Sequence, residues 1–478
     1  MTYVSIEFYI FVLIAVLLYY MIPLKGRWIV LLCGSIFFYW KALETGTGII
    51  VILATILIAY GAGLLLQKKR HKALLIGSVL LVVLPWLCIK NGNYFLQSIL
   101  HRDAVAWIVP VGISFYTLQI ISYLADIYQN KITAQRNPAK FALYVMFFPQ
   151  IVQGPIPRYD RMEAQLFSGH AFCERTVVGG FCKILWGFFL KLMIADRAAV
   201  IVNEIFDHHD QYVGCYVLVA GILYSIELYA DFAACISISK GVANLFGIHL
   251  ADNFHHPYLA TSVKDFWHRW HISLSEWLRD YIYIPLGGSR KGKVRTYINL
   301  VITFLVSGIW HGAGLRFIVW GMMHAVYQIA GQMTHGIREK AVKLLGLRKA
   351  PELCIWIQRI CTFFFVMVAW IIFRAPNLTI GLQMIGSMFR VHNMWIFTND
   401  ALLMLGLDWK EWIVLLISIV ILLAVSLKQE KGLSFSEAIY RQPIGVRWML
   451  YLVVIFAIMT YGVYGVGYDS QAFIYGGF

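Results

Sequence analysis

Charged residues are scarce in this chain. Asp, Glu, Lys and Arg make up 14% of its 478 residues, whereas soluble domains carry about 25%. Hydrophobic residues make up 60%, so the composition excludes an ordinary soluble domain. One transmembrane helix takes roughly 20 apolar residues. The sequence therefore predicts an all-α polytopic integral membrane protein with roughly eleven transmembrane helices, over residues 5–23, 28–43, 48–66, 73–90, 105–128, 178–206, 212–230, 313–334, 354–373, 410–427 and 448–466.

Several other features are missing. The eight cysteines are scattered, with no Cys-x-x-Cys pair, and no histidine cluster has zinc spacing. We therefore expect neither a disulfide framework nor a metal site. The N-terminus lacks the basic region and cleavage site of a signal peptide, so the first apolar run should remain as a helix. Without repeats, low-complexity tracts or a long polar linker, residues 1–478 should form a single membrane-embedded domain.

Acidic residues are also few. The chain has 25 Asp and Glu against 40 Lys and Arg, which gives a net charge of +15. Nucleic acid is not the expected partner, because the basic residues lie mainly in short loops beside apolar runs, as cytoplasmic anchors do. This pattern places residues 25–27, 68–72, 338–349 and 428–447 in the cytoplasm. Both termini and residues 41–47 and 376–409 then lie outside, in a multi-pass protein of the cell membrane surrounded by lipid.

Two polar stretches interrupt the apolar pattern. Trp310-His311-Gly312 ends the apolar run 297–309, and the charged stretch Asp265 to Asp280 precedes it. Polar groups at membrane depth are costly and usually face a cavity, a partner or a reaction path. Apolar pieces at 141–153 and 297–310 contain Pro, Gly or polar residues, which is typical of broken or re-entrant segments shielded inside a bundle. We expect all of these to enclose a buried catalytic chamber.

Imidazole suits a general base, because its reference pKa lies near neutrality. His311 is the candidate base, and the alternative is a structural histidine bonded to a backbone carbonyl. His271 is either a second active-site residue or a polar group in helix packing. Asp265 and Arg269 lie at i and i+4, so they should pair on one helix face. The aromatic stripe Trp267, Trp270, Trp277 and Tyr281 is either an interfacial anchor, which is the commoner case, or a substrate platform.

Five motifs resemble those of the membrane-bound O-acyltransferases, and the bacterial alginate-acetylation branch is the most similar. They are Val111-Gly-Ile-Ser-Phe-Tyr116, Phe148-Pro-Gln-Ile-Val-Gln-Gly-Pro-Ile-Pro-Arg158, Phe266-Trp-His-Arg-Trp-His271-Ile-Ser-Leu-Ser275, Arg279-Asp-Tyr-Ile-Tyr-Ile-Pro-Leu-Gly-Gly288 and Gly308-Ile-Trp-His311-Gly312. The resemblance implies helices around a central tunnel, with a catalytic core at about 105–335. It implies that His271 orients or polarises a thioester. It also implies substrate contacts at Trp310, Trp270, Arg269, Ser273 and Asp231.

The chain departs from the family pattern at two places. Asp231-Phe-Ala-Ala-Cys-Ile-Ser237 lacks the second acid of the usual motif, and His255 stands where Asn is common. Gln150 and Gln153 lie beside the helix-breaking Pro149 and Pro155. They either line the tunnel or, as we expect, satisfy freed backbone groups. The basic loop 287–295 either binds donor phosphates or, as is commoner, anchors the chain in the cytoplasm.

The last ten residues, 469–478, contain Phe473-Ile-Tyr475-Gly-Gly-Phe478. This tail resembles one in which the tyrosine is thought to carry an acyl group, so Tyr475 is the third candidate catalytic residue. The alternative is an aromatic tail resting at the membrane interface.

The resemblance implies transfer of an acetyl group from cytoplasmic acetyl-coenzyme A, which is a substrate and not a bound cofactor. The group would pass through Tyr475 to an SGNH-type partner outside the membrane, for O-acetylation of a polysaccharide or cell-wall polymer. One alternative is D-alanyl transfer to teichoic acid from a carrier protein. A transporter or flippase is a further alternative, but the chain lacks the two corresponding interrupted helices of such folds.

Overall fold

The structure is a computed structural model, and it describes residues 1–43, 47–98, 100–105 and 109–464. This part of the chain is helical and contains no strand, which confirms the all-α prediction. Its α-helices are α1 (Ile6–Met21), α2 (Arg27–Ala42), α3 (Thr47–Lys68), α4 (Lys72–Ser98), α5 (Ile113–Tyr128), α6 (Pro138–Met146), α7 (Tyr159–Phe167), α8 (Glu174–Phe188), α9 (Asp196–Asp207), α10 (Cys215–Leu245), α11 (Val263–Arg269), α12 (Ile272–Leu278), α13 (Lys293–His311), α14 (Leu315–Met333), α15 (His335–Leu344), α16 (Pro351–Arg374), α17 (Leu378–Arg390), α18 (Trp409–Glu430), α19 (Phe435–Tyr440) and α20 (Ile444–Tyr461).

Within the described residues, seven helical stretches are long and apolar enough to cross a membrane. They are Gly48–Lys68, Lys72–Gln97, Glu174–Asp207, Cys215–Leu245, Pro351–Arg374, Trp409–Glu430 and Ile444–Tyr461, and the shorter α1 is also apolar. The multi-pass membrane character of the chain follows from these helices, but the expected count of eleven spans is not confirmed.

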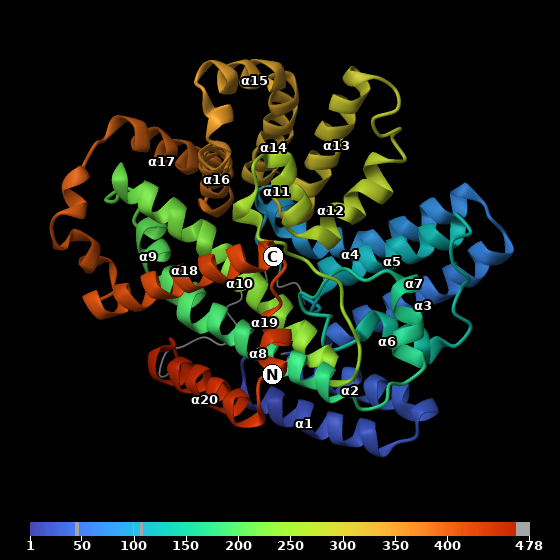
Figure 1. The fold of residues 1–478 in the computed structure, drawn as a ribbon. Coiled ribbons are helices and arrows are strands. Elements are labelled where there is room, and N and C mark those ends of the chain that lie inside the picture. Colours follow the sequence, from blue (N-terminus) through green and yellow to red (C-terminus); the bar gives the residue numbers. More distant parts are fainter. Residues whose placement is uncertain (44–46, 99, 106–108, 465–478) are drawn as a thin grey trace.

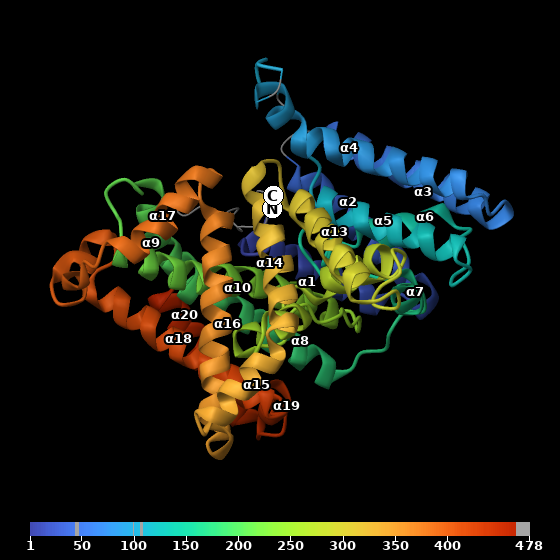
Figure 2. The same ribbon diagram turned by 90° about the horizontal axis from the view of Figure 1, so that it is seen from above.

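Helix α10 lies at the middle of the bundle (Figure 1) and packs against α8, α9 and α16. Helices α1 to α7 lie to one side of it in that view, while α14 and α16 run side by side on the other (Figure 2). The segments that carry the candidate catalytic histidines, α11 to α13, therefore lie between the two groups of helices.

The structure corrects two expectations about individual segments and confirms a third. Helix α5 begins only at Ile113, because the preceding Gly112 has a left-handed backbone with φ +73°. The position requires glycine, since a Cβ there would lie 2.0 Å from the Ile151 carbonyl oxygen. The segment 297–310 is not broken, since it lies inside the continuous helix α13. The segment 141–153 is broken as expected, because α6 ends at Met146, just before Pro149.

The expected helix at 178–206 contains a π-helical segment, η2 (Phe189–Ala195), between α8 and α9. It carries Lys191, which is buried, with its Nζ 2.7 Å from Asp231 Oδ1 and 2.8 Å from Asp196 Oδ1. The C-terminal part of the described chain docks on the same segment, since the Val463 N–H donates to the Leu192 carbonyl at 3.0 Å. This wide helical turn therefore connects the buried ion pairs to the end of α20.

Candidate active site

His271 occupies a sharp corner between α11 and α12. The corner is held by backbone pairing with the preceding loop, because the Ile272 N–H donates to the Asn253 carbonyl at 2.9 Å. The Asn253 side chain accepts from both the N–H and the hydroxyl of Ser273, at 3.0 and 2.7 Å. These contacts hold His271 at φ +45°, a conformation that costs energy for a residue with a side chain and often marks a functional site.

The His271 side chain is buried among aromatic rings. It is 1% exposed, and its ring centroid lies 4.8 Å from that of Phe232 and 6.0 Å from that of Trp310. Neither ring nitrogen has a hydrogen-bond partner within the described part of the chain. A buried polar group without a partner calls for an explanation, and a ligand in the chamber supplies one. This favours the active-site interpretation of His271 over a packing role.

His311 ends α13 and is 2% exposed. Its ring meets the rings of Trp310, Trp320 and Phe373 edge to face, at centroid distances of 4.8, 4.9 and 5.4 Å. Helix α13 approaches α14 very closely here, because a Cβ on Gly321 would lie 2.3 Å from the Phe304 carbonyl oxygen. The backbone of α14 therefore sets the depth of His311 in the chamber.

Trp310 lies between the two histidines, since its ring contacts both of theirs. Its indole N–H donates to the Ser114 carbonyl oxygen at 3.3 Å. The Ser114 hydroxyl oxygen in turn accepts from Trp86 and from Lys90 Nζ, each at 3.2 Å. Residues of α4, α5 and α13 thus hold the Trp310 ring in place, and both imidazole rings contact it.

Two polar residues of this chamber were missed in the sequence. His324 of α14 is fully buried, and its Nδ1 accepts from the Trp267 indole N–H at 3.1 Å. Lys90 of α4 lies 6.0 Å from the Trp310 ring centroid. Both are ionisable residues inside apolar runs, which is the signal that could have found them.

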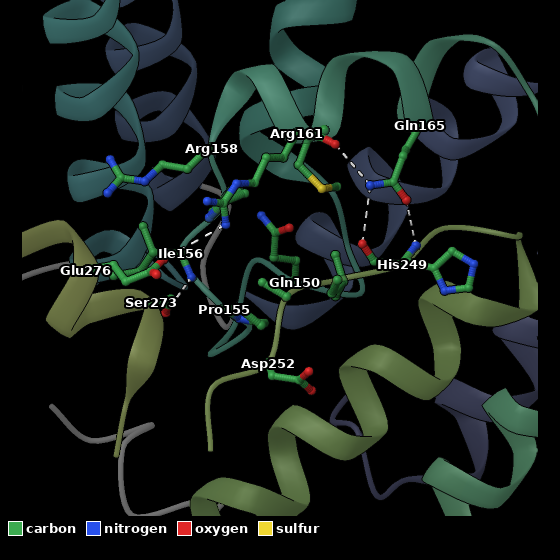
Figure 3. Close-up of a pocket in the computed structure, with 14 residues that line it drawn as sticks. Gln150, Pro155, Ile156, Arg158, Arg161, Gln165, His249, Asp252, Ser273 and Glu276 are labelled. Carbon is green, nitrogen blue, oxygen red and sulfur yellow. Dashed lines mark hydrogen bonds and ion pairs between the residues drawn. The ribbon is translucent and has the colours of Figure 1, made fainter. Parts of the chain in front are cut away.

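A surface pocket of about 230 Å³ opens beside the His271 corner (Figure 3). Ser273, two residues beyond His271, lines it, and its hydroxyl oxygen accepts from the Ile156 N–H at 3.0 Å. Gln150 also lines it with a buried side-chain oxygen, and both amide atoms of Gln153 are buried. None of these three atoms has a partner among the described residues. The expected structural role is therefore wrong for Gln153, and the Gln150 oxygen in the pocket lining is available to a ligand.

Basic and acidic side chains both line the pocket, the acidic ones being Asp252 and Glu276. Arg158 and Arg161 line it, Arg158 donates to Asp280 at 3.0 Å, and Arg161 is only loosely paired with Glu276 at 3.9 Å. Burial, followed by the charge of Lys183, lowers the pKa of His249 on the pocket wall. The pocket is thus mixed in charge, and the loosely paired Arg161 is the group that can meet an anion.

The other predicted site residues form ion pairs or are buried among aromatic side chains. Arg269 pairs with Asp265 at 2.8 Å, as expected, and with Glu430 at 2.9 Å, while Asp231 pairs with Lys191. Trp270 is 1% exposed and packs on Phe266 and Trp370. The interfacial-anchor interpretation is wrong for three members of the aromatic stripe, since all are buried: Trp267, Trp270 and Trp277.

The predicted substrate contacts stay predictions. They are those of Trp310, Trp270, Arg269, Ser273 and Asp231. Tyr475 lies outside the described residues.

The profile of the membrane-bound O-acyltransferase family matches residues 134–373, which include both histidines and the residues that line the pocket. The chain belongs to the membrane-bound O-acyltransferase family. It is 34% identical to the probable alginate O-acetylase AlgI of Pseudomonas syringae pv. tomato, over 75% of this chain and 69% of that protein. This protein is accordingly an O-acyltransferase.

Two further relatives of this O-acyltransferase have other names. The peptidoglycan O-acetyltransferase of Helicobacter pylori is 34% identical, over 60% of this chain and 57% of its own. The teichoic acid D-alanyltransferase of Bacillus subtilis is 28% identical, over 54% of this chain and 68% of its own. The three named acceptors are thus all envelope polymers or exopolysaccharides.

The close approach of α13 and α14 leads to a test on this O-acyltransferase. We expect Gly321→Ala to lower stability by about 1–3 kcal/mol, as overpacking does, and to lower acyl transfer, because the new methyl group pushes α14 away from His311. The measurements are the thermal unfolding midpoint in detergent and the rate of acyl transfer. Gly331→Ala is the matched control on the same helix, where a Cβ meets nothing within 4 Å. Equal behaviour of the two variants would contradict this role of Gly321.

Proposed function

We propose that this O-acyltransferase carries an acetyl group from a cytoplasmic thioester, acetyl-coenzyme A, across the cell membrane for O-acetylation of an extracellular polysaccharide or cell-wall polymer. The observation that carries the proposal is the pair of buried imidazoles, His271 and His311, against one indole ring. A pocket lined by Arg158 and Arg161 lies beside the first of them.

The pocket supports a thioester donor. Coenzyme A and phosphopantetheine carry phosphates, which Arg161 and the positive surroundings of His249 would attract. The amide of Gln150 suits the amide groups of the pantetheine arm, because it lines the pocket and its buried oxygen has no partner among the described residues. The arm would then lead past Ser273 to His271.

The direction of α13 supports delivery on the outer side. The helix starts at Lys293, directly after the basic residues Arg290 and Lys291, which positive-inside anchoring assigns to the cytoplasm. His311 lies 18 residues along, and at 1.5 Å per residue that is about 27 Å. His311 would therefore stand on the outer side of the Trp310 ring, with His271 and the donor pocket on the other side.

The chemical step needs one base and one nucleophile. His311 would take the proton of the Tyr475 phenol as its oxygen attacks the thioester carbonyl. The carbon–sulfur bond breaks, the leaving thiolate receives the proton, and an acetyl ester of Tyr475 remains. An SGNH-type serine transferase outside the membrane would then accept the acetyl group, and this ester is activated enough for that second transfer.

The deciding experiment is mass spectrometry of the purified chain after incubation with acetyl-coenzyme A. We expect one acetyl group on the peptide that contains Tyr475, and none there in Tyr475→Phe or His311→Ala. Tyr464→Phe is the matched control, because this tyrosine lies only a few residues earlier and is exposed. Absence of an adduct on the wild type, with polymer acetylation intact in Tyr475→Phe cells, would refute the relay.

D-Alanyl transfer is the second candidate, and the teichoic acid D-alanyltransferase of Bacillus subtilis is the observation that favours it. The same experiment with a D-alanyl carrier protein as donor separates the two candidates. The mass added to Tyr475 identifies the acyl group directly.

A further inference from the structure

Two histidines and a glutamate from distant parts of the chain meet beside the loop that holds His271. His255 and His256 lie in the loop after α10, and Glu430 is the last residue of α18. Their potential ligand atoms all lie within 4.8 Å of one another. Two imidazoles and one carboxylate are ligands that zinc and the neighbouring divalent metals prefer. We propose that His255, His256 and Glu430 form a binding site for a divalent transition-metal ion, with Zn²⁺ as the ligand to test first.

The charge around Glu430 suits a cation. Arg269 Nη1 donates to both oxygens of Glu430 at 2.9 Å, and Arg269 Nε donates to Asp265 at 2.8 Å. One guanidinium and two carboxylates sum to one negative charge, which attracts a cation. Carboxylates that bind metals commonly accept hydrogen bonds from a second layer of residues, and Arg269 has that position here.

His256 supplies an independent observation. Its Nδ1 atom is buried and has no hydrogen-bond partner among the described residues. Its backbone is held at φ +46°, a strained conformation, next to a His255 ring at a centroid distance of 5.1 Å. A metal ion would satisfy the orphaned nitrogen and would explain why the loop keeps this conformation.

The potential ligand atoms, which lie within 4.8 Å of one another, must move closer together to bind zinc. Tetrahedral zinc bonds of about 2.1 Å put neighbouring ligand atoms about 3.4 Å apart. His255 Nδ1 lies 3.9 Å from Glu430 Oε2, and the His255 side chain is 59% exposed, so it can turn without repacking a core. Arg269 already holds the loop in register, because its carbonyl oxygen accepts from the His255 N–H at 2.9 Å.

The metal site that we propose would connect two distant segments of the chain. A bound ion would fasten the end of α18 to the loop that pairs with the His271 corner, since Asn253 in that loop accepts from the Ile272 N–H. No sequence motif reveals the cluster, because Glu430 is far along the chain from the two histidines. The expectation of no metal site followed from motif spacing alone. This inference does not depend on the proposed acetyl relay.

The test is isothermal titration of the full chain in detergent with Zn²⁺, after chelator treatment and removal of any affinity tag. We expect one ion per chain in the wild type, at least tenfold weaker binding in His256→Asn and in Glu430→Gln, and unchanged binding in His268→Asn. Asn tolerates a positive φ, and Gln can still accept from Arg269, so both variants should fold. Their thermal midpoints in chelator, compared with that of the wild type, check this.

A second readout is the thermal midpoint with Zn²⁺ added. It should rise for the wild type and for His268→Asn, and it should stay constant for His256→Asn and Glu430→Gln. Wild-type protein that binds no zinc, or variants at His256 and Glu430 that bind it as the wild type does, would overturn the proposal.

Discussion

Replacing His311 with alanine should lower the rate of acyl transfer by about 10²- to 10⁴-fold, the range that a lost general acid–base contributes. The reason is geometric, since this imidazole is buried at the end of α13 against Trp310 and Trp320. We expect kcat to fall while KM for the thioester stays nearly constant, because the donor pocket lies beside the His271 corner. Steady-state release of free thiol measures both constants.

The control separates chemistry from folding. His311→Gln keeps a polar side chain of similar size, and its thermal midpoint should match that of the wild type while the rate stays low. His271→Asn suits the positive φ at its position and should also lose activity without unfolding. An His311→Ala enzyme that keeps wild-type kcat would remove His311 from the catalytic role.

The second large effect concerns stability. Lys191→Met should lower the free energy of unfolding by about 3–5 kcal/mol, because it leaves two carboxylates, one buried and one half-buried, without the ammonium that lies between them. Those carboxylates are Asp196 and Asp231, each within 3 Å of Lys191 Nζ. The measurement is the fraction of folded protein that survives a heating series, read from size-exclusion chromatography.

The double variant Lys191→Met/Asp231→Asn should recover part of this loss, since it removes one of the stranded charges. Arg175→Met is the matched comparison at the surface. Arg175 is 64% exposed where it pairs with Glu437 at 2.7 Å, and solvent screens such pairs, so little change is expected. Similar losses in the buried and exposed variants would show that burial does not set the strength of the Lys191 pairs.

The sequence predicts the membrane class well because composition and apolar runs are local properties. It does less well at segment boundaries. The run at 297–310 contains Gly308, which suggests a break, yet Gly308 lies inside α13 and lets Phe317 of α14 approach, since a Cβ there would meet the Phe317 carbonyl oxygen at 2.4 Å. A glycine that breaks a helix and one that lets two helices touch look the same in a sequence.

The sequence likewise identifies some residues of the candidate site and misses others. His271 and His311 lie in distinctive motifs, so they could be singled out, and the structure brings both against Trp310. Lys90 and His324 lie in plain apolar runs, so their place in the chamber depends on distant packing. The stripe at Trp267, Trp270 and Trp277 is buried and not interfacial, because the neighbours that cover it, such as Trp370, are far away in the chain.

The π-helical turn η2 has a consequence for protein engineering. A π-helix holds an extra residue within its turn, so deleting one residue between Phe189 and Ala195 would restore a regular helix. The flanking helices α8 and α9 would keep their faces, but the residues of η2 would present different ones. Lys191 would then lose its alignment with Asp196, and Leu192 would lose its alignment with Val463. Chimaeras between this enzyme and its relatives should therefore be spliced outside this segment, with α9 and α20 taken from the same parent.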